Sequence, residues 1–114
     1  MAMTTAAEKL KEQPGIDVRQ LKAGNVLLVE TETAVYEMRV IAARTPLLEI
    51  TSSDPVLRAP TVGEYVAGKL HAVEVPRWIG KGLMMTIRFR NGEYTSRPVV
   101  SAEVKGPGWS YDVF

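Results

Sequence analysis

The pattern of hydrophobic and polar residues changes character at about residue 25. Before it, residues 5–13 are rich in helix formers, and Glu8 follows Thr5 by three positions, as in a capping box. Pro14-Gly15 ends this segment, which holds only one large apolar residue to bury. We predict that residues 1–15 form a helical or disordered segment, capped by Thr4 or Thr5, and that residues 16–114 form a single β domain.

After residue 25 the pattern is that of short strands. Residues 26–29 are apolar on both faces, as in a central strand, whereas residues 35–42 alternate, with Tyr36, Met38 and Val40 on one face. Turn residues separate further runs at 47–51, 65–75, 84–90, 93–100 and 109–114. Close-set strands without intervening helices predict a mainly β fold, either a small antiparallel β-barrel or a compact sandwich, with a short N-terminal helix.

The stretch Leu21-Lys22-Ala23-Gly24-Asn25, followed by an apolar strand, resembles the opening of an SH3-like or Sm-like small barrel. The resemblance is one of fold, covers the first hairpin and implies no particular ligand or activity.

The amino-acid composition excludes several kinds of metal and catalytic site. The 114 residues suit one domain, and 14 Lys and Arg against 13 Asp and Glu give a net charge of +1. The absence of Cys excludes disulfides and thiolate metal sites, and the single histidine, His71, excludes sites that need two. His71 with Glu74 or Asp54 lacks the Gly-x-Ser-x-Gly turn of a serine hydrolase. We therefore expect no metal, no cofactor and no enzymatic activity.

Asn91-Gly92 is a strong hairpin signal, and a two-residue loop there pairs Arg90 with Glu93 and Phe89 with Tyr94. One face of this hairpin is then apolar, and the other carries the guanidinium groups of Arg88, Arg90 and Arg97. Guanidinium groups at alternating positions suit phosphate or carboxylate ligands. The alternative is a solvated outer face on which Arg90–Glu93 is a weak pair.

The neighbouring stretch, residues 75–82, combines Arg77, Trp78 and Lys81 with Gly80 and Gly82. Backbone amides at such glycines can form an anion-binding nest, and an indole beside cations can stack a base or anchor a partner protein. Alternatively, Trp78 plugs one end of the barrel and the glycines serve only the turn. The candidate ligand-binding residues are Arg77, Trp78, Lys81, Arg88, Arg90 and Arg97.

Two functions follow. The first is a non-catalytic binding module for an anionic partner, a nucleic acid or a protein. The second is a structural or self-associating protein that uses β edge strands, among them the aromatic strand at residues 109–114, and forms a homo-oligomer. We expect no membrane segment, because no apolar run is long enough. With no secretory signal at the start, we expect a cytoplasmic location.

Overall fold

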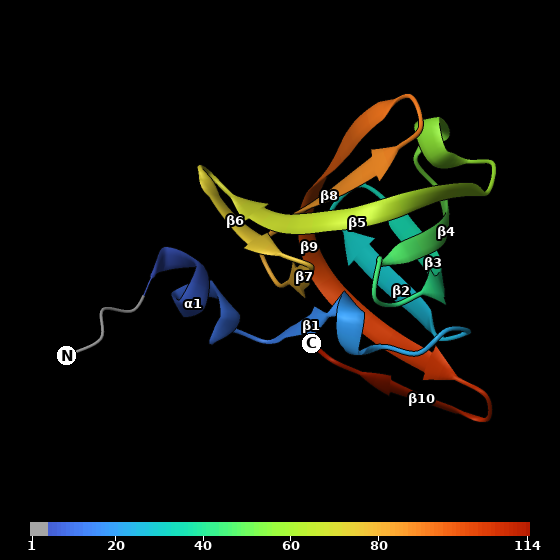
Figure 1. Ribbon diagram of the computed structural model, residues 1–114, viewed down its shortest axis with the longest axis horizontal. Coiled ribbons are helices and arrows are strands. Elements are labelled where there is room, and N and C mark those ends of the chain that lie inside the picture. The colour runs from blue at the N-terminus through green and yellow to red at the C-terminus, as the bar shows by residue number, and fades with distance from the viewer. Residues whose placement is uncertain (1–4) are drawn as a thin grey trace.

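The computed structural model describes residues 5–114 and is mainly β, with one short N-terminal helix (Figure 1). Helix α1 spans Ala6–Lys11, and its N-cap is Thr5. The Thr5 hydroxyl accepts a hydrogen bond from the Glu8 N–H at 3.1 Å and donates one to the Glu8 carboxylate at 3.2 Å. The predicted N-cap at Thr5 is therefore confirmed, although the Glu8 carboxylate accepts from the Thr5 hydroxyl rather than from the Thr5 N–H that a full capping box requires. The alternative cap at Thr4 lies outside the described residues.

The strands and 3₁₀ helices that follow are β1 (Gly15–Asp17), η1 (Val18–Gln20), β2 (Val26–Thr31), β3 (Val35–Ala42), β4 (Leu47–Ser52), η2 (Pro55–Leu57), β5 (Thr61–Leu70), β6 (Val73–Pro76), β7 (Trp78–Gly80), β8 (Met84–Phe89), β9 (Gly92–Gly106) and β10 (Trp109–Asp112). The prediction of one long strand at 65–75 is wrong, because the chain reverses at His71, whose φ is +54°, to form the β5–β6 hairpin. The strand predicted at 93–100 instead continues to Gly106.

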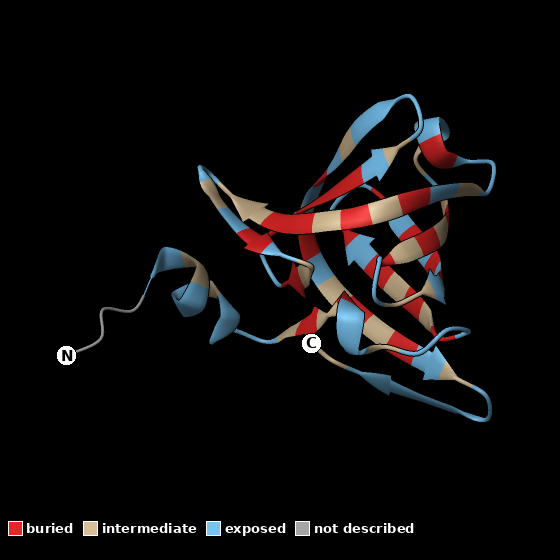
Figure 2. Cartoon of the chain, viewed as in Figure 1, coloured by how far each residue is buried: buried red, intermediate tan, exposed pale blue. Residues whose placement is uncertain are grey.

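Six strands form a closed circuit of antiparallel pairs, in the order β2, β3, β4, β5, β8, β9 and back to β2. Strand β9 closes it, since its first half pairs with β8 and its second half with β2. This circuit confirms the predicted mainly β, antiparallel fold, in which a small barrel and a compact sandwich were the two alternatives, and its ring of strand pairs is barrel-like. Figure 2 shows buried and exposed residues alternating along its strands. In β3, for example, Tyr36, Met38 and Val40 are buried while Glu37 and Arg39 are exposed.

The two end strands of the sheet, β6 and β10, have different surroundings. Helix α1 packs against β6 and β7, and β1 pairs with β7 in a separate two-stranded sheet that begins one residue before the expected domain boundary (Figure 1). Strand β10 pairs only with β9, so that its other edge has no strand beyond it among the described residues. An open edge of this kind presents unpaired backbone groups to solvent.

The β8–β9 hairpin is shifted by two residues from the predicted register. Phe89 lies opposite Gly92 and Arg88 opposite Glu93, so that Arg90 and Asn91 form the turn. A type I′ turn at Asn91-Gly92 needs positive φ at both residues, and of these two only Gly92 has it, at +139°. Because side chains alternate with a period of two, the shift leaves the predicted face of nearly every residue unchanged. Thr86, expected on the outer face, is the exception and is buried.

Gly68 in β5 offers a test of how closely the strands approach. A Cβ added to Gly68 would collide with the Trp78 carbonyl oxygen, which belongs to the backbone and cannot move away cheaply. We expect Gly68→Ala to lower the free energy of unfolding by about 1–3 kcal/mol, the usual cost of overpacking. Urea unfolding is the measurement, and Thr95→Ala, at an exposed strand position, is the control expected to stay within about 0.5 kcal/mol.

Candidate functional site

The hairpin arginines do not form a bare cationic array. Arg88 lies between two carboxylates, opposite Glu64 on β5 and opposite Glu93 on β9, and its guanidinium is 3.8 Å from Glu93. The expected Arg90–Glu93 pair is thus replaced by Arg88–Glu93, as the shifted register requires. Glu93 therefore compensates part of the charge of Arg88, whereas the Glu64 carboxylate pairs with Arg77.

Arg77 is also engaged. Its Nη1 donates a hydrogen bond to the Val66 carbonyl at 2.9 Å, and its Nη2 lies 3.7 Å from the Glu64 carboxylate. The backbone at Arg77 has a φ of +60°, in the left-handed region that non-glycine residues rarely adopt. The Arg77 N–H donates to the same Val66 carbonyl at 3.0 Å. These contacts make Arg77 a clamp between β5 and β7.

Trp78 packs on the N-terminal segment. Its ring lies over Gly15 and Gly80, where an added Cβ would collide with the indole, and Lys11 Nζ stands 5.8 Å from the ring centroid. The indole Nε1 is buried and has no hydrogen-bond partner among the described residues. This packing favours the structural interpretation of Trp78 over the exposed contact that the sequence suggested.

The glycine-rich turn does not form an anion nest. The N–H groups of Lys81, Gly82 and Leu83 donate to carbonyl oxygens, of Pro14 at 3.4 Å, Val99 at 2.8 Å and Gly80 at 3.1 Å respectively. Amides already bonded to carbonyls cannot also bind an anion. These bonds favour the alternative interpretation, in which Gly80 and Gly82 serve only the turn.

The remaining cations are exposed but scattered. Lys81 precedes β8 and Arg90 follows it, so that the two residues lie at opposite ends of a strand about 20 Å long. Arg97 lies on β9. Within residues 5–114, Lys81, Arg90 and Arg97 form no ion pair. The β8 strand therefore separates Arg90 from Lys81, while the register places Arg97 near the Lys81 end.

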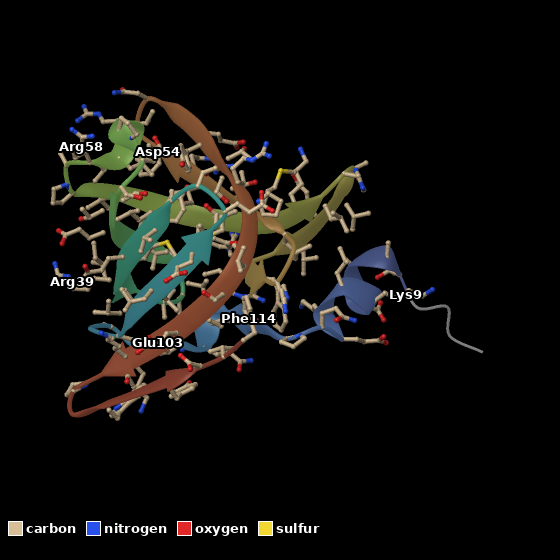
Figure 3. All side chains as sticks on the ribbon, turned by 180° about the vertical axis from the view of Figure 1, so that it is seen from behind. Lys9, Arg39, Asp54, Arg58, Glu103 and Phe114 are labelled. Carbon is tan, nitrogen blue, oxygen red and sulfur yellow. The ribbon has the colours of Figure 1, made fainter. Side chains whose placement is uncertain are left out.

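A polar chain that the sequence analysis missed lies at the hairpin end of the barrel. The hydroxyls of Tyr36 on β3 and Tyr94 on β9 are 2.6 Å apart, and the Tyr94 hydroxyl donates to the Asp54 carboxylate at 2.5 Å. Since an ionised carboxylate only accepts, the Tyr36 hydroxyl donates to Tyr94. Asp54 also accepts the Val56 N–H at 3.0 Å and so caps η2. In Figure 3, Asp54 lies beside η2.

The ionisation of these groups follows from their contacts. The hydrogen bond from Tyr94, followed by that from the Val56 N–H, lowers the pKa of Asp54 below its usual value. Burial raises the pKa of Tyr36. Burial and then the bond to Asp54 raise the pKa of Tyr94. The chain therefore consists of two neutral phenols and one carboxylate, each with its partner, and it acts as a clip between β3, β9 and η2.

His71 does not join this chain. It is exposed in the β5–β6 turn, which follows the last residue of β5. Asp54 and η2 instead come before the first residue of β5. The His71–Asp54 pair considered from the sequence is therefore not formed. Among residues 5–114, no group of three His, Asp or Glu side chains is placed to hold a metal ion.

The β9–β10 hairpin presents a second feature. Pro107 and Gly108, with a φ of +77° at Gly108, form its turn, and Trp109 packs over Gly106 on the opposite strand. The rings of Trp109 and Tyr111 stack with centroids 5.4 Å apart and an interplanar angle of 17°. Yet these side chains are 45% and 54% exposed. A stacked aromatic pair at an open sheet edge is a surface of the kind that partners bind.

Comparisons of the chain with protein-family models, with curated proteins and with solved structures found no match. Within residues 5–114, no helix has the length and apolarity to cross a membrane.

The Tyr36–Tyr94–Asp54 chain predicts how stability depends on pH. Because the pKa of Asp54 is lower in the folded state, its contribution is present above its unfolded value of 3.8 and is lost as the pH falls through the folded pKa. Tyr94→Phe removes the hydrogen bond that is the main cause of the lowered pKa of Asp54. We therefore expect the variant to lose less stability below about pH 4 than the wild type does. Urea midpoints between about pH 7 and pH 2.5 measure this, and parallel curves would contradict it.

Tyr94→Phe has a second expected effect at neutral pH. It leaves the buried Tyr36 hydroxyl without its partner, and we expect a loss of about 1–3 kcal/mol in the free energy of unfolding. The control is Tyr111→Phe, whose hydroxyl lies on an exposed side chain and should cost almost nothing.

Proposed function

We propose that this chain is a non-catalytic interaction module that binds a partner protein by adding an extended strand to β10, in the cytoplasm expected from the sequence. The observation that carries the proposal is the exposed Trp109–Tyr111 stack on β10, an edge strand whose outer side has no neighbouring strand among the described residues. Strand addition gains affinity from main-chain hydrogen bonds and specificity from alternate side chains. Trp and Tyr are the residues that most often dominate such interfaces.

The backbone of β10 supports strand addition. The Val113 N–H donates to the Ala102 carbonyl on β9 at 2.9 Å, in the register that continues the β9–β10 pairing. Because backbone groups alternate in direction along a strand, the N–H groups of Trp109 and Tyr111 also face β9. Those of Ser110 and Asp112 face the open edge. An incoming strand therefore finds donors and acceptors at alternate residues.

Selection of peptides tests this proposal. We expect a displayed library of random extended peptides to yield binders that protect the Ser110 and Asp112 amides from hydrogen exchange. Trp109→Ser should weaken their binding at least about tenfold, as expected for a central aromatic contact. The matched control is Val62→Ser, an exposed apolar residue on β5 that should leave binding unchanged. Binders insensitive to Trp109→Ser, or no binders at all, would contradict the proposal.

An anionic ligand is the second candidate function. The exposed Lys81, Arg90 and Arg97, which form no ion pair within residues 5–114, favour it. If it holds, oligonucleotides or acidic polymers bind at low salt, and the affinity falls steeply as salt rises. Charge reversal by Arg90→Glu with Arg97→Glu should abolish this binding, while Trp109→Ser leaves it unchanged. Binding that survives the double reversal would rule this candidate out.

A further inference from the structure

We infer that the strand added to β10 is β10 of a second copy of this chain, paired antiparallel about a twofold axis at Ser110; the inference rests on the proposed function. A twofold interface presents the same patch from both copies, so the patch must be complementary to itself. Strand β10 forms the outer edge of its hairpin, where a second copy can approach (Figure 1). Two properties of the strand meet this requirement, and a third sets the strength of the pairing.

The first property is the backbone. An axis at Ser110 places its free N–H and C=O opposite the same groups of the second Ser110, which gives a hydrogen-bonded pair at the centre. On either side, each Trp109 then lies opposite the Tyr111 of the second copy. These are positions without backbone hydrogen bonds, where opposite side chains come closest. Since Trp109 and Tyr111 share a face, the four aromatic rings form two adjacent cross-strand pairs on one face of the interface.

The second property is charge. Asp112 is the only charged residue in β10. With the axis at Ser110, the two copies of Asp112 lie four positions apart along the strands, roughly 14 Å, which is beyond the screening length in physiological salt. With the axis one residue further along, at Tyr111, the aromatic faces also stay together, but the two copies of Asp112 become diagonal neighbours at about 7–8 Å. Repulsion between these carboxylates favours the axis at Ser110.

The third property is area, which sets the strength of the pairing. A buried Trp or Tyr removes about 150–250 Å² from water, and about half of each ring is exposed here, so four rings bury roughly 400 Å². Even with the backbone included, the interface stays below the ~1,000 Å² typical of stable complexes. We therefore expect a weak dimer that appears as the concentration rises.

Sedimentation equilibrium of the full chain, from about 10 µM to about 1 mM, measures this association. We expect the wild type to shift from monomer toward dimer over that range. Ser110→Lys and Ser110→Asp each place like charges opposite each other on the axis, so each should weaken the dimer several-fold, and Ser110→Lys more strongly because Lys105 of the same chain lies opposite position 110. An equal mixture of the two variants should regain the dimer, because Lys then faces Asp. Thr95→Lys, at an exposed position elsewhere on β9, is the control expected to dimerise normally.

The outcomes separate the inference from the function on which it rests. Dimerisation that both single variants weaken and their mixture restores supports the inference. If Ser110→Lys instead strengthens the dimer, the introduced lysine faces Asp112 of the second copy and the axis at Ser110 is wrong. A wild type that stays monomeric but still binds selected peptides overturns the inference and leaves the proposed function standing. Failure of both self-association and peptide binding overturns both. Circular dichroism verifies folding, and Trp109→Ser, which should also weaken the dimer, replaces any variant that does not fold.

Discussion

The barrel depends on one constraint: β9 has to pair with β8 along its first half and with β2 along its second, in addition to β10, and its 15 residues are enough to do so. The junction lies at Val99, which exchanges backbone hydrogen bonds with Gly82 and Leu83 at 2.8 and 2.9 Å and lies opposite Thr31 in β2. Without this long strand the circuit would open and leave two further edges exposed to solvent. The same strand positions both features with functional interest, since Tyr94 is near its beginning and its last residues support β10.

The two ends of β9 differ in how their polar groups are satisfied. At the Tyr94 end, the hydroxyls of Tyr36 and Tyr94 would cost free energy if they were buried without partners. They form a chain of hydrogen bonds that ends at the Asp54 carboxylate, which also caps η2. At the β10 end, backbone groups and two aromatic rings remain open to solvent. A polar network with every member paired stabilises the fold, whereas an unpaired edge gains free energy only when something binds it. This contrast is why we assign the clip to stability and the edge to interaction.

The candidate site was the part least accessible from the sequence. Alternation correctly placed Arg88 and Arg97 on the solvent side, because that depends only on the period of a strand. It could not show that Glu64, 24 positions away from Arg88, lies across from it, or that Gly15 lies under the Trp78 ring. Both contacts join segments distant in sequence, and both reduce what the predicted ligand residues can offer. The aromatic alternation at Trp109 and Tyr111 was visible in the sequence, but only the structure shows that the strand is left at an open edge.

The sequence by itself determined the fold class, the positions of most strands and the faces of their side chains, since these follow from local turn preferences and a period of two. It also determined the N-cap at Thr5, which is local. Tertiary structure decided the register of the β8–β9 hairpin, where a shift by two residues keeps nearly every face and is therefore invisible to alternation. There, the Tyr94 hydroxyl bonds to Tyr36 and Asp54, partners 58 and 40 residues away. These hydrogen bonds between residues distant in sequence fix the position of Tyr94 along the barrel. No local sequence pattern contains that information.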